Sequence, residues 1–445
     1  MRREWRALLS GEDAERARSI AREVAVRLTT PELLETTLAN AGRRLAEAGA
    51  QARGWSGAGL SGAASSAAVL CAQLDRAEPE AGWDRRGHAA LSAAAEVAGR
   101  SGTTLGLYDG IAGLGFSAAL LAGQRARYSG MLASVDELIV GATGPRSVEL
   151  ASARGLSVAD WDLISGMTGV GVHLLGRREL PAQRDALEQL LAGLVGLASD
   201  DGDPPRWSTP PEHLYTNLRE ITPVGNVNCG LSHGVPGPLA LMSLALEAGV
   251  EVPGQLDAMR RTADWLAAQA LPGRFGSEWP AAVPLADGAR PAPVQGTALP
   301  GWCYGNAGVA RALWLSSRAL ADTGLAVTAV DALTVALERQ RAERPLNAPT
   351  LCHGTAGLAQ VSLRIAADSG DPEIASEARE LCVELVNWFE PDAPLGYRDV
   401  TVGRDEPRLA VDDPTLLAGA AGTAIVLLAS ADNHDPEWDR ALLLS

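Results

Sequence analysis

The chain has 445 residues, of which 47% are hydrophobic and only 4% aromatic, and its formal net charge at pH 7 is −16. So acidic a chain lacks the basic patches that bind phosphate, which excludes nucleic acid as a main partner. Few aromatic and many small aliphatic residues are typical of a soluble globular protein made of closely packed helices.

The N-terminal part of the chain carries no visible chemistry. Residues Met1–Arg18 are charged and contain no apolar signal core. We expect residues 1–50 to form an N-terminal helical segment that caps the domain of residues 51–445.

No apolar run approaches the length of a membrane span, and the five cysteines resemble reduced thiols more than a disulfide framework. These features predict a cytoplasmic protein.

Further along the chain the phrase Gly-x-x-Gly recurs, seven times if a degraded first copy is included. Each copy precedes an apolar run that suits a buried helix, such as Val309–Leu320, and amphipathic stretches such as Leu256–Ala268 lie between copies. The repeating unit is therefore a pair of helices.

Several apolar runs end at a glycine that fits a helix C-cap, among them Gly123, Gly324 and Gly370. The copies begin at Gly62, Gly110, Gly166, Gly234, Gly305, Gly354 and Gly419.

Seven helix pairs can stack as an open solenoid or close into a ring. The all-round apolar character of one helix in each pair favours closure, with these helices inside and the amphipathic helices outside. We therefore predict an all-α fold, an α/α toroid or double-layered barrel of seven helix pairs. In a ring, the residues before each first glycine converge on one face: Ser61, Asp109, Ser165, His233, Tyr304, His353 and Ala418.

Two copies carry a cysteine at matching places. Cys303 follows Gly301-Trp302, and Cys352 is followed directly by His353. Two thiolates and one imidazole form a ligand set that zinc accepts, with a fourth position open for water or substrate, as in catalytic zinc sites. The pattern predicts one Zn²⁺ per chain, held at the centre of the ring by Cys303, Cys352 and His353.

Further residues complete the candidate site. Asp162 lies one helical turn before Gly166 and can reach the same face, or it can serve only as a helix N-cap. The imidazole of His233 suits proton transfer near neutral pH, although it can also be a satisfied core histidine. Tyr304 can organise the site or simply pack against the ring. The remaining thiols are expected to be small buried hydrophobes: Cys71, Cys229 and Cys382.

Two long Pro-rich insertions, residues 200–228 and 274–300, precede His233 and Cys303. Loops of this length in a compact fold are often functional. We place peptide binding in these insertions; the alternative is that they are plain surface excursions.

The chain resembles the lanthipeptide (lantibiotic) cyclases of the LanC family. Four phrases carry the resemblance: Asp162-Leu163-Ile164-Ser165-Gly166, Gly230-Leu231-Ser232-His233-Gly234, Trp302-Cys303-Tyr304-Gly305 and Cys352-His353-Gly354. The resemblance implies an α/α toroid with zinc bound by Cys303, Cys352 and His353. It also implies that His233, Asp162 and Tyr304 serve in proton transfer and site organisation. One departure is Leu299, where members often carry an arginine.

The resemblance implies that a peptide cysteine thiol adds to dehydroalanine or dehydrobutyrine to form (methyl)lanthionine thioether rings. We expect a stand-alone, zinc-dependent class I cyclase that acts on a dehydrated precursor peptide, leader plus core, in transient complex with a separate dehydratase. The alternative is a LanC-like protein without a ring-forming role, either a thiol-adduct enzyme that adds glutathione or a peptide-binding scaffold. A third alternative is a different α/α toroid, such as a glycosidase or terpene cyclase. Those enzymes would need paired carboxylates or acidic metal clusters, whereas the Gly-x-x-Gly faces offer thiols and imidazoles.

Overall fold

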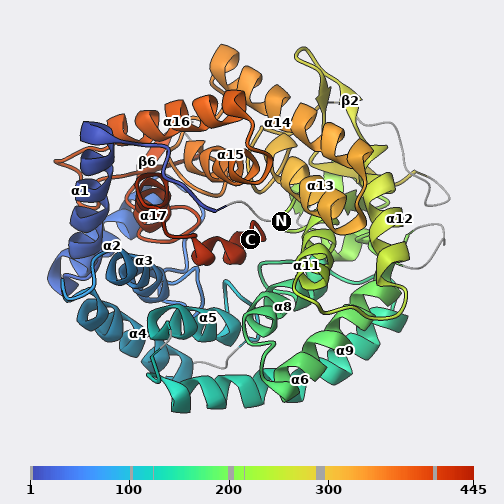
Figure 1. Ribbon diagram of the computed structural model, residues 1–445, viewed down its shortest axis with the longest axis horizontal. Coiled ribbons are helices and arrows are strands. Elements are labelled where there is room, and N and C mark those ends of the chain that lie inside the picture. Colours follow the sequence, from blue (N-terminus) through green and yellow to red (C-terminus); the bar gives the residue numbers. More distant parts are fainter. Residues whose placement is uncertain are drawn as a thin grey trace. The chain divides into compact units, whose positions relative to one another are not determined.

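The computed structural model describes residues 4–100, 104–123, 125–198, 205–214, 216–286, 296–403 and 408–445. The chain divides into two compact units. Unit 1 consists of Met1–Thr104, Tyr108–Leu132 and Arg344–Trp438, and unit 2 consists of Leu105–Leu107, Ala133–Glu343 and Asp439–Ser445. Each unit contains a layer of almost fully buried helices and an outer layer of half-buried ones (Figure 1).

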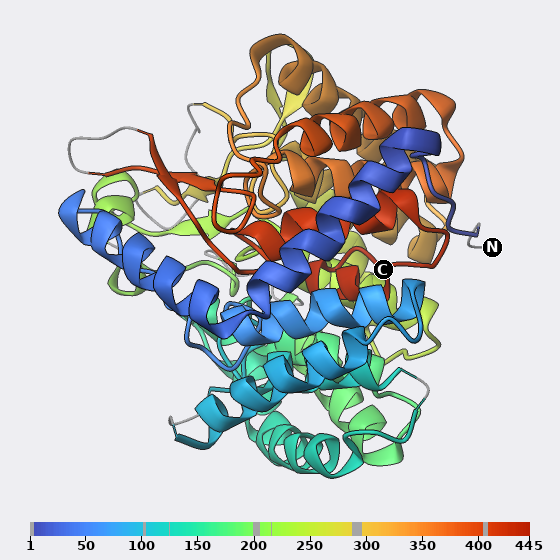
Figure 2. The ribbon, with the colours of Figure 1, turned by 90° about the vertical axis from the view of Figure 1, so that its left-hand side faces the viewer.

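Unit 1 contains α1 (Gly11–Leu28), α2 (Pro31–Glu47), α3 (Ala63–Ala77), α4 (Trp83–Arg100), α5 (Ile111–Ala122), α15 (Thr355–Ser369), α16 (Pro372–Asn387) and α17 (Ala420–Ala431). The buried helix α3 packs on the outer helix that follows it, α4, and α15 packs on α16 in the same way. The outer partner of α17 is α1, so the N-terminal segment supplies a helix of this pair (Figure 2). That segment forms two helices because Pro31 starts the second of them.

Unit 2 contains most of α6 (Ser129–Ser152), then α7 (Val158–Trp161), α8 (Met167–Gly176), α9 (Pro181–Ala198), η1 (Pro211–His213), α10 (Thr216–Ile221), α11 (Pro236–Glu247), α12 (Gln255–Ala267), α13 (Asn306–Leu320) and α14 (Thr323–Glu343); η2 (Glu437–Leu442) ends the chain's helices. The buried helices α8, α11 and α13 lie side by side, and each packs on the outer helix that follows it, α9, α12 and α14. The expected unit of one buried and one amphipathic helix is therefore present in both units.

Burial explains the two kinds of helix. Every one of the 12 residues of α17 is buried, whereas α12 buries only one stripe, which includes Ala258, Met259 and Leu266. No helix in the described ranges is long and apolar enough to cross a membrane.

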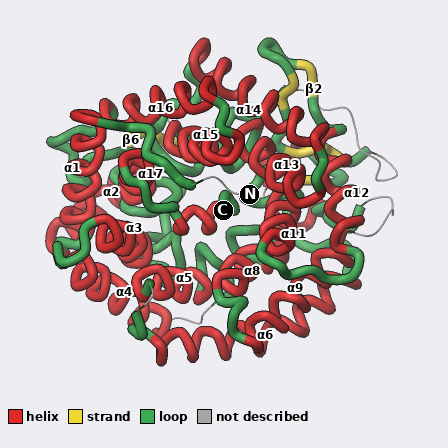
Figure 3. The backbone as a smooth tube through the Cα atoms, in the orientation of Figure 1, coloured by secondary structure: helices red, strands yellow, loops and turns green. Residues whose placement is uncertain are grey.

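The sequence did not predict the short strands, which form antiparallel ribbons between helices (Figure 3). The strands are β1 (Asn226–Asn228), β2 (Leu271–Pro272), β3 (Ser277–Glu278), β4 (Ala282–Pro284), β5 (Asp399–Thr401) and β6 (Leu409–Val411), and they pair as β1–β4, β2–β3 and β5–β6. The β1–β4 ribbon, with Val227 opposite Val283, joins the two Pro-rich insertions. Residues 200–204, 215 and 287–295 of these insertions lie outside the described residues.

The repeated glycines stand where the chain turns into a buried helix. The first glycine of a copy is the N-cap of α3, α5, α8, α13, α15 and α17, and Gly234 stands just before the N-cap of α11. A Cβ added to Gly305 would lie 1.8 Å from the Leu299 carbonyl oxygen, and one added to Gly419 would lie 2.1 Å from that of Asp413. Gly305 also has φ +94°. In five of the seven copies glycine is required because the carbonyl six residues earlier occupies the space of a side chain; at Gly62 and Gly166 the backbone four or five residues earlier occupies it.

Candidate functional site

The residues just before the first glycines are accessible in both units, whereas the glycines themselves are buried. In unit 2 these accessible residues are Ser165, His233 and Tyr304; in unit 1 they are Ser61, Asp109, His353 and Ala418. A buried helix N-terminus thus presents one side chain per copy to solvent. A reactive side chain at this position is therefore accessible to a substrate.

In unit 2, Asp162 and His233 form a hydrogen-bonded pair. The Nδ1 atom of His233 lies 2.5 Å from Oδ2 of Asp162, which ends the short helix α7 and is 1% exposed. The other oxygen of Asp162 accepts the N–H groups of Ser165 and Gly166, both at 2.8 Å. Asp162 is therefore both a cap for the turn into α8 and the residue that orients the imidazole. Because a carboxylate only accepts, Nδ1 carries the proton and Nε2 is the nitrogen that can exchange one with a substrate.

Tyr304 lies beside this pair. Its ring centroid is 6.4 Å from that of His233, with 30° between the ring planes. The Nδ2 group of Asn228 donates to the Tyr304 hydroxyl at 3.2 Å, and the Asn228 Oδ1 accepts the Gly230 N–H at 2.9 Å. Asn228 is the last residue of β1, so the ribbon made by the two insertions reaches the candidate site.

Cys303 belongs to the same part of unit 2. The residue is 9% exposed, and its carbonyl accepts the N–H of Ser232 at 3.5 Å. The neighbouring Trp302 is fully buried and donates from Nε1 to the Leu442 carbonyl at 3.0 Å. These contacts hold the loop that contains Trp302 and Cys303 next to the loop of His233. Leu299, the departure noted above, is 47% exposed.

In unit 1, Cys352 and His353 occupy the loop before α15. The Cys352 N–H donates to the Leu417 carbonyl at 2.8 Å. His353 Nε2 lies 3.1 Å from Oδ1 of Asp399, whose side chain is fully buried while that of His353 is 39% exposed. Burial acts to raise the pKa of Asp399, but His353 and Arg53 together hold that pKa below its usual range.

The three predicted zinc ligands are divided between the units: Cys303 is in unit 2, and Cys352 and His353 are in unit 1. Over the described ranges, no three His, Cys, Asp or Glu side chains are grouped so as to hold a metal ion. The donor chemistry fits zinc nonetheless. Two thiols and one imidazole are zinc ligands, and the imidazole of His353 has the carboxylate partner on its other side that metal-bound histidines usually have. The ligand assignment remains a prediction.

The other thiols are structural, as expected. Cys71, Cys229 and Cys382 are buried at 0 to 1% exposure, and burial raises the pKa of each thiol to about 12. They are neutral at physiological pH and are therefore not activated nucleophiles.

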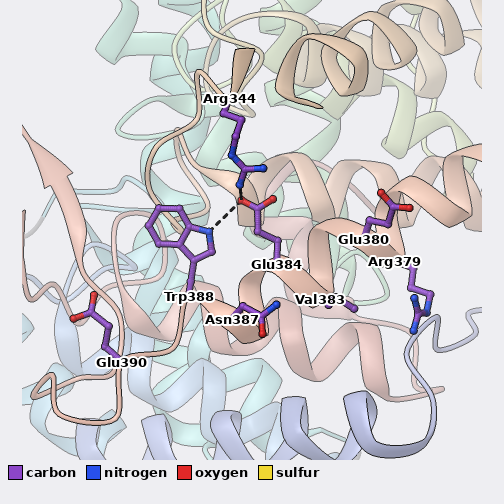
Figure 4. Close-up of a pocket in the computed structure, with 8 residues that line it drawn as sticks. All are labelled: Arg344, Arg379, Glu380, Val383, Glu384, Asn387, Trp388 and Glu390. Atoms are coloured by element: carbon purple, nitrogen blue, oxygen red, sulfur yellow. Dashed lines mark hydrogen bonds and ion pairs between the residues drawn. The ribbon is translucent and has the colours of Figure 1, made fainter. Parts of the chain in front are cut away.

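A cavity of about 690 Å³ opens along α16 in unit 1 (Figure 4). Within its lining, Glu384 accepts from Arg344 at 2.7 Å and from the Trp388 Nε1 at 3.1 Å. The cavity contains none of the candidate residues and no histidine or cysteine. It does not offer the chemistry of the sites described above.

Comparison with known proteins adds independent information. A family model described as "Lanthionine synthetase C-like protein" matches residues 54–443. The chain is 23% identical to "Nisin biosynthesis protein NisC" of Lactococcus lactis subsp. lactis over 260 residues. The aligned part covers 57% of this chain and 60% of that protein, which is less than two thirds of its length. A solved structure of "Nisin cyclase" matches with a TM-score of 0.72 at 17% identity and covers 92% of this chain and 97% of that one. This similarity confirms the predicted fold class, an α/α toroid.

Proposed function

Because the chain belongs to the lanthionine synthetase C-like family, we propose that it is a zinc-dependent lanthipeptide cyclase. Its substrate is a dehydrated precursor peptide, leader plus core, supplied by a separate dehydratase. The observation that carries the proposal is the Asp162–His233 pair at 2.5 Å, in the same unit as Cys303 and beside Tyr304. The names of the similar proteins, a nisin biosynthesis protein and a nisin cyclase, support the substrate class.

In this proposal Cys303, Cys352 and His353 hold one zinc ion. A zinc ion with an open position lowers the pKa of a coordinated thiol and so supplies a thiolate at neutral pH. Cys352 and His353 are both partly exposed, which leaves room for a peptide thiol to approach them.

The protein groups complete the addition. The substrate sulfur forms a bond to the β-carbon, the C=C electron pair moves to the α-carbon and its carbonyl, and a proton must then reach the α-carbon. His233 can supply that proton from Nε2, since its Nδ1–H is held by Asp162 and the positive charge of the protonated ring lies next to a carboxylate. The thiol proton is released to solvent, so the product has the same mass as the dehydrated substrate.

Zinc content tests the metal part of the proposal. We expect about one zinc per chain in the wild type, purified without added metal, and a large loss in Cys352→Ala, because a four-coordinate site needs all its protein ligands. Elemental mass spectrometry measures both. The matched control is Cys229→Ala, which removes a buried thiol with a pKa of about 12 and should leave the zinc content unchanged. A folded wild-type protein that stays metal-free after incubation with zinc contradicts the proposal.

Cyclisation tests the reaction itself. Incubation with a dehydrated peptide that contains cysteine should remove alkylatable thiols without a change in peptide mass. Leu299, which places an exposed apolar side chain where cyclases often carry arginine, is the observation that favours the alternative of a thiol-adduct enzyme. With glutathione present, that enzyme would instead increase the peptide mass by one glutathione for each dehydrated residue consumed.

A further inference from the structure

Behind His353 lies a buried chain of charged groups that the reaction above does not require. Asp399 at the start of β5 has 0% exposure and faces the His353 Nε2 at 3.1 Å. Its other oxygen accepts from Arg53 at 2.6 Å, and the same guanidinium donates to Asp413 at 2.7 Å. One arginine therefore joins two buried carboxylates.

Asp413 is held just as firmly. Its Oδ2 also accepts the Trp55 Nε1–H at 2.8 Å, and its Oδ1 accepts the N–H and the hydroxyl of Thr415 at 2.9 and 2.6 Å. The participating segments precede α3, precede α15, start β5 and follow β6. All of them belong to unit 1. Residues 404–407, between β5 and β6 in the sequence, lie outside the described residues.

Stability alone is a weak reason for such a network. Desolvation of buried ions offsets much of their mutual attraction, and apolar residues of similar volume often replace them without loss of stability. What the network does fix is the orientation and tautomer of one partly exposed imidazole. A carboxylate with its oxygens already facing Arg53 and His353 accepts the Nε2–H, and that tautomer places the lone pair of the ring on Nδ1.

We propose that Asp399, locked by Arg53 and through it by Asp413 and Trp55, is a positioning residue that holds His353 as the Nδ1-ligating tautomer for the metal. The inference rests on the proposed function, because it requires His353 to be a zinc ligand. It extends that function to four residues outside the ligand set. The network also makes the segment before α3 and the β5–β6 ribbon part of the metal centre's support.

Unit 2 offers a matched control. Asp136 is 2% exposed, faces the Nε2 of the buried His173 at 2.8 Å and pairs with Arg177 at 2.7 Å. This trio has the same chemistry as Asp399, His353 and Arg53 but its histidine is no predicted ligand. Asp136→Asn therefore measures what the loss of a buried Asp–His–Arg trio does to the fold alone.

The experiment compares wild type, Asp399→Asn and Asp136→Asn. Zinc is added to the metal-free proteins in competition with a chromophoric chelator, and the Tm of each metal-free protein is recorded. In Asp399→Asn the side-chain amide can donate to Nε2 and favour the wrong tautomer, so we expect roughly 10- to 100-fold weaker zinc binding. Asp136→Asn should lower the Tm but leave the zinc Kd at the wild-type value.

The outcomes separate the two proposals. A zinc Kd for Asp399→Asn equal to that of wild type overturns the positioning role while the zinc site stands. A wild type that binds no zinc overturns both. If Asp399→Asn folds poorly, Arg53→Gln keeps the carboxylate and removes its anchor. A wild-type Kd in that variant likewise contradicts the role of the network, and a weaker Kd together with altered d–d bands in the Co²⁺-substituted protein supports it.

Discussion

The two oxygens of Asp162 face different partners, and this separates two roles that a sequence pattern cannot distinguish. Oδ1 accepts the backbone N–H groups of Ser165 and Gly166, and Oδ2 faces the His233 ring. An asparagine at this position keeps one oxygen for the two N–H groups. Its amide cannot stabilise a protonated imidazole, because it carries no negative charge.

Asp162→Asn should therefore lower the rate of ring formation by roughly 10²- to 10⁴-fold, the usual contribution of positioned proton transfer. Zinc content and Tm should stay close to wild type because the cap is retained. Single-turnover assays by thiol alkylation measure the rate. A wild-type rate in Asp162→Asn would show that the residue is only a helix cap.

Asp160 provides the control for this prediction. It lies two residues earlier in the same short helix and accepts the Ser157 N–H at 2.9 Å as part of a capping box. Asp160→Asn changes a capping carboxylate without touching His233. We expect no change in the rate and a loss of stability of at most about 1 kcal/mol.

At the scale of the element, the turn into each buried helix is set by a close approach of backbone to glycine. At Gly422 in the first turn of α17, an added Cβ would lie 1.8 Å from the Leu416 carbonyl oxygen and 2.8 Å from Leu351. The carbonyl belongs to the backbone and cannot move aside as a flexible side chain can. The cost of a substitution therefore comes from displacing the helix or the loop before it.

Gly422→Ala should lower the free energy of unfolding by about 2 kcal/mol or more, as strain in a buried backbone does. Gly141 lies exposed within α6, with nothing within 4 Å of the added Cβ. Gly141→Ala should instead raise the free energy of unfolding by about 0.5–1 kcal/mol, because alanine favours the helix. Urea denaturation measures both changes. Equal effects of the two substitutions would contradict the role of the close approach.

These turns also show what the sequence could predict. The Gly-x-x-Gly register placed the buried helices correctly, because the packing that demands glycine lies within six residues of it along the chain. The C-cap expected at Gly324 was wrong: Gly324 lies inside α14, and Ala321 takes the left-handed conformation with φ 54° at the end of α13. The sequence after α13 allowed the helix to end at either Ala321 or Gly324, and only the general preference for glycine at helix C-caps favoured Gly324.

Candidate site residues could be proposed from the sequence where they sit on the repeat, but their distant partners could not. His233, Tyr304 and His353 were singled out because each precedes a repeated glycine. Arg53 and Asp399 are 346 residues apart, and no local pattern connects them. Asn228 and Asp413 carried a weak signal, since each lies six residues before its glycine and accepts the N–H two residues further on.

At the scale of the whole molecule, the composition makes alkaline stability unusually simple to interpret. The chain contains no lysine, so all 38 of its Lys and Arg residues are arginine. Arginine keeps its charge throughout, and tyrosines begin to titrate only near pH 10. Among the side chains, the thiols are therefore the groups that lose protons between about pH 8.5 and 10.

The three buried thiols, Cys71, Cys229 and Cys382, have pKa values raised to about 12 in the folded protein, against about 8.5 in the unfolded chain. Below pH 8.5 these thiols are protonated in both the folded and the unfolded state, so they add no pH dependence to the free energy of unfolding. Above it the unfolded state releases the proton and the folded state does not. The free energy of unfolding should then fall by about 1.4 kcal/mol per pH unit for each thiol, or about 4 kcal/mol per pH unit for the three together by pH 10.

Urea denaturation at pH 7.5, 9 and 10 measures this slope, and Cys382→Ala isolates one thiol. The variant should be less stable than wild type at pH 7.5, because a buried sulfur is lost from α16. Its stability should nevertheless fall less steeply with pH, so that the difference from wild type narrows as the pH rises. A variant whose stability falls in parallel with wild type would show that Cys382 ionises equally in both states. Burial would then not raise its pKa, and the distinction between silent and reactive thiols in this chain would need another cause.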